Sequence, residues 1–166
     1  MMHPTGFAVY AEHSDSMKPM AKGMNTRVFN RTEVQHGAGI HLEPGTGTVH
    51  LGPGAYHVTA TSIVTCVDPA AADPTTVPML PAAFGGYCRL RHLEDTDCPN
   101  EQAICVGTIS NADMLPSTVD TFLHVERDAR IVLEHQIGDK VDGVYLQVNA
   151  GSSSWHVFAR IAIQRI

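Results

Sequence analysis

The sequence has few charged residues and no long apolar run. Aspartate, glutamate, lysine and arginine make up only 17% of the 166 residues, and the formal net charge is −6. Nucleic-acid-binding proteins usually present a basic field, so this balance argues against a general phosphate-binding surface. No window approaches the ~18 apolar residues that are needed to span a bilayer. We therefore expect neither a nucleic-acid partner nor a membrane partner.

The beginning of the chain lacks the features of a secretory signal. The stretch MMHPTGFAVYAEHSDS has neither a basic segment nor an apolar run of sufficient length. By default this predicts a cytoplasmic location, or an export route that the sequence does not show.

None of the four cysteines is in CxxC spacing, so a structural zinc site has no support. In the absence of a signal peptide we expect reduced thiols. Two of them flank an acidic turn and could face each other across a hairpin, namely Cys88 and Cys105. The other two are Cys66 and Cys98.

Enzyme motifs are also absent. The chain contains no G-x-S-x-G, no H-E-x-x-H, no P-loop and no G-x-G-x-x-G. The sequence therefore predicts no catalytic residue, no resident metal and no cofactor.

What the sequence does contain is alternation between apolar and polar residues, with turns between the alternating segments. The clearest stretch is EPGTGTVHLGPGAYHVTAT, residues 43–61. Val49 and Leu51 alternate with polar neighbours, and after Gly52–Gly54 the pattern resumes in residues 56–60. Glycine and proline between the two runs indicate a turn. This stretch predicts a strand, a turn and a second strand.

Similar segments recur along the chain and none has the period of a helix. Strands are expected at residues 7–11, 27–29, 37–42, 87–93, 104–109, 121–126, 129–135, 144–148 and 155–164, besides the pair just described. The sequence therefore predicts an all-β sandwich or barrel of about ten antiparallel strands, in a single domain spanning residues 1–166.

Several short motifs, in their order and spacing, resemble the C1q-like branch of the C1q/TNF superfamily. The family begins with an aromatic and small-residue strand, continues with a "TG…PG.Y" pattern, and later has a Gly-Asp turn between two strands. The matching residues are Gly6–Tyr10, Val28–Asn30, Thr46–Gly47, Pro53–Tyr56, Ile131–Leu133, Gly138–Val141, Tyr145–Val148 and Phe158–Ile161. The chain departs from the family by insertions at Asp68–Gly86 and Glu94–Glu101, and by lacking a glycine at Arg160.

The resemblance implies a C1q/TNF-like jelly roll that assembles as a homotrimer and acts in binding or adhesion. On this interpretation the chain is not an enzyme. Its partners are copies of itself and a protein or glycan ligand, which the sequence does not identify, bound through loops at one end.

Two alternatives arise from residues that bind metals. A cupin enzyme is also a jelly roll, and it would use His41, Glu43, His50 and His57 as ligands, although the H-x-H run of the first cupin motif is missing. The acidic turn Glu94–Glu101 gathers oxygen ligands suited to calcium, but its spacing does not match an EF-hand. Most of the ten histidines lie opposite the aliphatic face of their strands, which is typical of solvated or interface histidines.

The last predicted strand suggests where the trimer forms. Its apolar face is Trp155, Val157, Ala159, Ile161 and Ile163. Phe158 then points the other way, and an isolated monomer would leave that ring in water. Burying it is worth on the order of 2 kcal/mol, so we expect Phe158 at the trimer interface.

Overall fold

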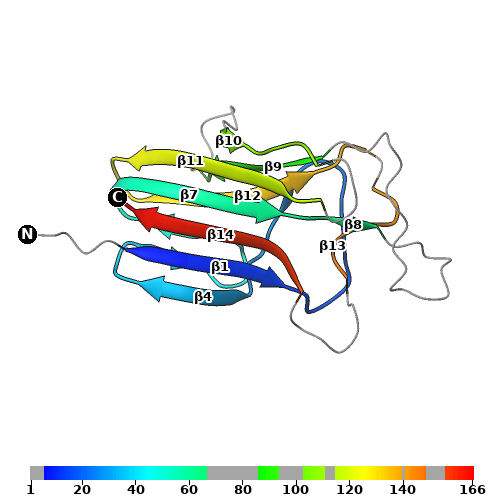
Figure 1. Cartoon of the computed structure of the whole chain (residues 1–166), viewed down its shortest axis with the longest axis horizontal. Coiled ribbons are helices and arrows are strands. Elements are labelled where there is room, and N and C mark those ends of the chain that lie inside the picture. Colours follow the sequence, from blue (N-terminus) through cyan, green and yellow to red (C-terminus); the bar gives the residue numbers. More distant parts are fainter. Residues whose placement is uncertain (1–5, 67–85, 94–102, 111–114, 140, 149–155) are drawn as a thin grey trace, which may run out of the picture.

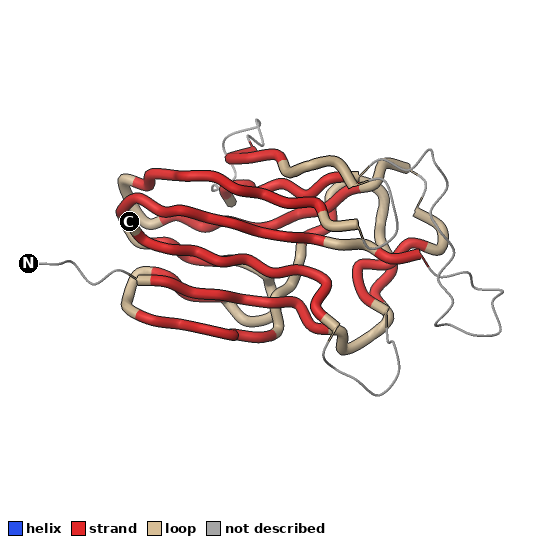
Figure 2. The backbone as a smooth tube through the Cα atoms, in the orientation of Figure 1, coloured by secondary structure: helices blue, strands red, loops and turns tan. Residues whose placement is uncertain are grey.

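The computed structural model describes residues 6–66, 86–93, 103–110, 115–139, 141–148 and 156–166. These residues form strands joined by turns, and none of them lies in a helix that could span a membrane. Two large sheets face each other, and a small third sheet lies at one end of the molecule (Figures 1 and 2).

The first large sheet has five antiparallel strands. Their order across the sheet is β11–β7–β14–β1–β4, as in the front layer of Figure 1. Their bounds are β1 Phe7–His13, β4 Arg31–His36, β7 Gly54–Ser62, β11 Ser117–Val125 and β14 Val157–Arg165. Strands distant in sequence, such as β1 and β14, are therefore neighbours.

The second large sheet packs behind the first. Its order is β10–β9–β12–β6–β5, and β3 also pairs with β12. The bounds are β3 Asn25–Thr26, β5 Ile40–Leu42, β6 Val49–Leu51, β9 Tyr87–His92, β10 Ala103–Val106 and β12 Ala129–Gln136. The small third sheet contains β2 Lys18–Pro19, β13 Val144–Gln147 and β8 Thr65–Cys66.

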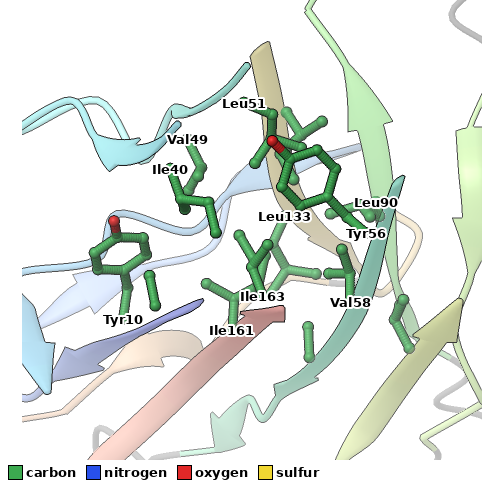
Figure 3. Packing of buried hydrophobic residues seen from close by; sticks show 14 of the residues in the cluster. Tyr10, Ile40, Val49, Leu51, Tyr56, Val58, Leu90, Leu133, Ile161 and Ile163 are labelled. Carbon is green, nitrogen blue, oxygen red and sulfur yellow. The ribbon is translucent and has the colours of Figure 1, made fainter. Parts of the chain in front are cut away.

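The core lies between the two large sheets and is built from the inward-facing residues of each strand. Figure 3 shows aliphatic and tyrosine side chains from both sheets pointing toward one another. The largest fully buried members are Tyr10, Tyr56, Phe29, Leu51, Leu90, Ile131, Leu133, Ile161 and Ile163. Burial of this apolar area is the main force holding the sheets together.

The alternation in residues 43–61 is confirmed. Val49 and Leu51 are buried on β6, and Tyr56, Val58 and Ala60 are buried on β7. The turn between them transfers the chain from one large sheet to the other. Upstream of β6, Gly47 has a φ of 74°, a conformation that favours glycine. A Cβ atom at this position would also clash with the carbonyl oxygen of Arg27.

The all-β jelly-roll prediction is also confirmed, with two differences in the strands. Residues 27–29 are not a strand, because Arg27 and Phe29 turn into the core from an irregular segment. Residues 31–36 form β4, which the sequence analysis missed. All six of its side chains are exposed, so it has no apolar alternation to detect.

The described residues contain fourteen strands where about ten were predicted, and three of the fourteen are only two residues long. Three stretches of the sequence analysis fall wholly or mainly outside the described residues. They are Asp68–Gly86 except for its last residue, Glu94–Glu101, and the start of the last predicted strand at Trp155.

Candidate functional site

The outward face of the five-stranded sheet carries an unusual set of side chains. One row crosses all five strands, and its members are aligned by the strand register: Phe122, His57, Gln164, Phe7 and His36. The next row contains Asp120, Thr59, Ala162, Val9 and Val34. We call these two rows the Phe122 face.

Aromatic contacts organise the first row. The ring of His57 stacks on Phe122 with 4.5 Å between centroids, and Phe7 lies 5.5 Å from His36. His57 Nε2 is also 2.7 Å from Asp120 Oδ1 in the second row. Yet Phe122 is 67% exposed and Phe7 is 41% exposed, so these contacts leave most of Phe122 and a large part of Phe7 in water.

The sequence contained the signal for this face, although the sequence analysis did not use it. Val119, Leu123 and Val125 alternate along β11 and are buried, which forces Phe122 to the opposite side. In the second row, Val34 is 40% exposed. Several large apolar side chains exposed on one face of a sheet are typical of an interaction surface.

Phe158 does not belong to this face, contrary to the expectation from alternation. In the single chain its ring is only 3% exposed, so no partner is needed to cover it. The cause is a β-bulge: Ala159 pairs with Glu12 and Val157 pairs with His13, which leaves Phe158 as the extra residue. Phe158 and Ala159 are consequently both buried. The premise that an isolated chain would leave the Phe158 ring in water is therefore wrong, and the placement of Phe158 at a trimer interface loses that support.

The cupin interpretation is not supported, because its four candidate ligands are divided between the two sheets. His41 and His50 stack on β5 and β6, at 4.5 Å between centroids, and His50 Nε2 is 3.0 Å from Glu43 Oε2. His57 is in the other sheet, where it contacts Asp120. Among the described residues, no three histidine, cysteine or acidic side chains are placed to hold one metal ion.

A shallow cleft lies next to the two stacked histidines. It has a volume of about 330 Å³, and its lining combines glycine backbone with charged and polar side chains: Gly39, His41, His50, Leu51, Gly52, Asp128, Ala129 and Arg130. This volume is at the lower end of the range for small-molecule sites.

A buried polar network closes the other end of the core, beside the small third sheet. Arg27 is fully buried and donates from Nη1 to Glu12 Oε2 at 3.2 Å and to the Leu146 carbonyl at 2.9 Å. Its Nε donates to Ser62 Oγ at 2.8 Å, and its Nη2 donates to the carbonyl of Ile63. Burial lowers the pKa of Arg27, and the charge of Glu12 opposes that shift.

His135 belongs to this network, so it is not one of the solvated histidines that the sequence analysis expected. It is fully buried, and its Nδ1 lies 2.7 Å from Ser62 Oγ. The Ser62 hydroxyl, which already accepts from Arg27, also shares a hydrogen bond with Nδ1, and His135 Nε2 has no hydrogen-bond partner among the described residues. Burial lowers the pKa of His135 from 6.5 to about 3.

No disulfide bond joins any two of the cysteines in the described residues. Cys105 lies opposite Leu90 and not opposite Cys88, so the two thiols do not face each other directly across the hairpin. Burial raises the pKa of the Cys88 thiol, which keeps it protonated and unreactive.

We predict four free thiols, including Cys98, when protein denatured without reductant is titrated with a thiol reagent. In the folded protein the partly exposed Cys105 should react well before Cys88. Fewer than four thiols would indicate an oxidising context.

Comparisons with known proteins show which solved structures share this fold. No protein-family model matches the chain, and no curated protein matches its sequence. Crystal structures of murine APRIL at pH 8.0 and pH 8.5 match with TM-scores of 0.59 and 0.60, at 8% and 7% identity. A third, at pH 5.0, matches with a TM-score of 0.52 at 8% identity. Each comparison covers 98% of this chain and 99% of the APRIL chain. The fold is a TNF-like jelly roll.

Proposed function

We propose that the chain is a non-enzymatic binding module that assembles as a homotrimer through the Phe122 face. The observation that carries this proposal is the exposure of Phe122 and Phe7 in one row across the five-stranded sheet. Sheets in water normally present polar side chains on their solvent face. Two exposed phenylalanines there indicate a surface that is covered in the working protein.

The occupant that we propose is a second and third copy of this chain. The motif resemblance to the C1q/TNF superfamily implies three-fold assembly, and the TNF-like fold of the chain agrees with that implication. In a closed three-fold ring every copy buries its own Phe122 face, and the assembly stops at three copies. This arrangement does not require Phe158, whose ring is already buried in the single chain.

A binding role is favoured over catalysis by the chemistry of the described residues. The exposed His57–Asp120 pair is covered on one side by Phe122, so it contributes to the surface and not to a catalytic cleft. The cupin ligand set is divided between sheets, as described above. The sequence also lacks the nucleophile motif G-x-S-x-G.

Light scattering tests the assembly. We predict a trimer for the wild-type protein and a monomer for Phe122→Glu, because three carboxylates would be buried together in the interface. Thermal unfolding of both proteins checks that the variant remains folded, which is expected since Phe122 is mostly exposed.

The matched control is Val106→Glu. Val106 is also an exposed apolar residue, at 58%, but it is on β10 at the edge of the other large sheet. This variant should remain trimeric. A monomeric wild type would refute self-association, a dimer would refute the three-fold arrangement, and equal loss of assembly in both variants would refute the Phe122 face.

A further inference from the structure

Two histidines face each other on the outer side of the six-stranded sheet, which is not the sheet that carries the Phe122 face. His41 on β5 is directly opposite His50 on β6, and their rings are stacked with 4.5 Å between centroids and 9° between planes. Ile40 and Leu51 next to them are buried, so the alternation of the strands directs both imidazoles outward. The self-association proposal makes no use of this pair.

The contact between His50 and Glu43 determines which ring nitrogen carries a proton. His50 Nε2 is 3.0 Å from Glu43 Oε2. An ionised carboxylate only accepts hydrogen bonds, so Nε2 donates and Nδ1 of the neutral ring keeps its lone pair. A histidine that binds a metal usually donates its other ring N–H to a carboxylate or carbonyl in this way. Glu43 therefore orients His50 as a metal ligand through Nδ1.

His41 supplies a second nitrogen beside the first. Its ring is exposed and makes no hydrogen bond within the described residues, and a neutral imidazole always has one nitrogen with a lone pair. Two nitrogens that share an ion at ~2.1 Å are at most about 4.2 Å apart. Since the two stacked rings are already this close together, a small rotation of the side chains brings both nitrogens onto one ion.

The surroundings of the pair leave room for water on a bound ion. The pair borders the cleft of about 330 Å³, and Gly39 and Gly52 contribute no side chain to its lining. Glu43 beside the pair and Asp128 in the lining each carry a negative charge, which opposes the positive charge of Arg130. Among the described residues no third histidine, cysteine or acidic ligand is placed with the pair, so water completes the coordination.

We propose that His41 and His50 together bind one divalent transition-metal ion, such as Zn²⁺, with water in the remaining positions. Imidazole nitrogen suits Zn²⁺, Ni²⁺ and Cu²⁺, whereas Mg²⁺ and Ca²⁺ prefer oxygen ligands. Glu43 is a positioning residue that holds the His50 ring. The site differs from the cupin set, which also needs His57 from the other sheet. It goes beyond the proposed binding module and does not depend on self-association.

Calorimetric titration of the full chain with Zn²⁺ near neutral pH tests the site. One Zn²⁺ per chain should bind at the tightest site, and Mg²⁺ should not compete with it. His41→Gln and His50→Gln should each weaken this binding about 100-fold, the effect of one lost imidazole ligand. Glu43→Ala should weaken it about tenfold, and Glu43→Gln, which keeps an acceptor oxygen for Nε2, should recover part of that loss.

NMR and thermal unfolding check where the ion binds and whether the variants are folded. Amide resonances of residues 40–43 and 49–51 should shift together as Zn²⁺ is added. Because both histidines are at least partly exposed, both glutamine variants should unfold at the wild-type temperature when no metal is present. Zn²⁺ should then raise the unfolding temperature of the wild type and have little effect on either variant.

The matched control is His124→Gln. His124 is an exposed histidine on β11 in the other sheet, and the residue opposite it is Ala55, so it has no second imidazole across the strand pair. This variant should bind Zn²⁺ with the wild-type dissociation constant. Wild-type affinity in both His41→Gln and His50→Gln, an equal loss in His124→Gln, or effective competition by Mg²⁺ would overturn the metal site.

Discussion

Replacing Arg27 with methionine is expected to lower the free energy of unfolding by about 3–5 kcal/mol, which is the usual cost of leaving one charge of a buried ion pair without its partner. Arg27 and Glu12 are both fully buried, and their closest atoms are 3.2 Å apart. Without the guanidinium, Glu12 keeps Gln147, which donates to it at 2.7 Å, and the more distant Lys18. Ser62 and two backbone carbonyls lose a donor as well.

Chemical denaturation of Arg27→Met and the wild type measures this loss. The matched control is another arginine–glutamate pair, in which Arg160 donates twice to Glu33 at 2.8 and 2.9 Å. That pair is exposed, so Arg160→Met should cost less than about 1 kcal/mol. Similar small losses in both variants would show that the buried network contributes little to stability. Adding Glu12→Gln to Arg27→Met should recover part of the loss, because the second change removes the uncompensated charge.

Much of the fold could be predicted from the sequence, because most strands alternate regularly. On β7, Tyr56, Val58 and Ala60 repeat every second residue and all are buried. A period of two residues directly reflects the geometry of a strand with one face on a core. Because many such segments together predict the class of fold, an error in one segment does not change that prediction.

The position of Phe158 could not be predicted, because it depends on one extra residue in a strand. On one side of a β-bulge, the residues that face inward and outward are exchanged. Here the bulge arises from the pairing of β14 with β1. The sequence of β14 alone gives no sign of where that partner shifts register. A prediction about a single side chain therefore failed while the strand itself was predicted correctly.

The candidate sites were predictable only in part, for a related reason. His41 and His50 are neighbours because β5 pairs with β6, and a short connection made that contact predictable. The distance between His50 and His57 is short in sequence, but the turn at Gly52–Gly54 places them in different sheets. Spacing along the chain does not determine which sheet a strand joins.

The polar residues of the buried network occupy inward positions of their strands, and the alternation pattern alone does not reveal their role. Ser62 and His135 continue the inward positions of β7 and β12, which are apolar up to that point. A polar residue at the end of an apolar series is easily interpreted as the end of the core. Here the core continues, and Arg27 and Glu12 complete it with hydrogen bonds that the pattern does not show.

The second large effect that we expect is a loss of stability in mild acid caused by His135. Its pKa is about 3 in the folded protein and 6.5 is the ordinary value, so the unfolded chain takes up a proton that the folded chain does not. Stability is therefore unaffected by this group above pH 6.5 and falls as the pH is lowered from 6.5 toward 3. At 1.36 kcal/mol per pH unit the full loss is about 5 kcal/mol, of which about 2 kcal/mol has occurred by pH 5.

Chemical denaturation at pH 7 and at pH 5 isolates this contribution when the wild type is compared with His135→Asn. Asparagine places an amide group near the position of Nδ1, where it can donate to or accept from the Ser62 hydroxyl, and it does not titrate in this range. The variant is less stable at pH 7 because the smaller side chain leaves a cavity, so the relevant quantity is the change between the two pH values. The wild type should lose about 2 kcal/mol more than the variant over that interval. Equal losses would mean that His135 is protonated in the folded state at pH 5, because the carboxylates that titrate in the same range are shared by both proteins and cancel in the comparison.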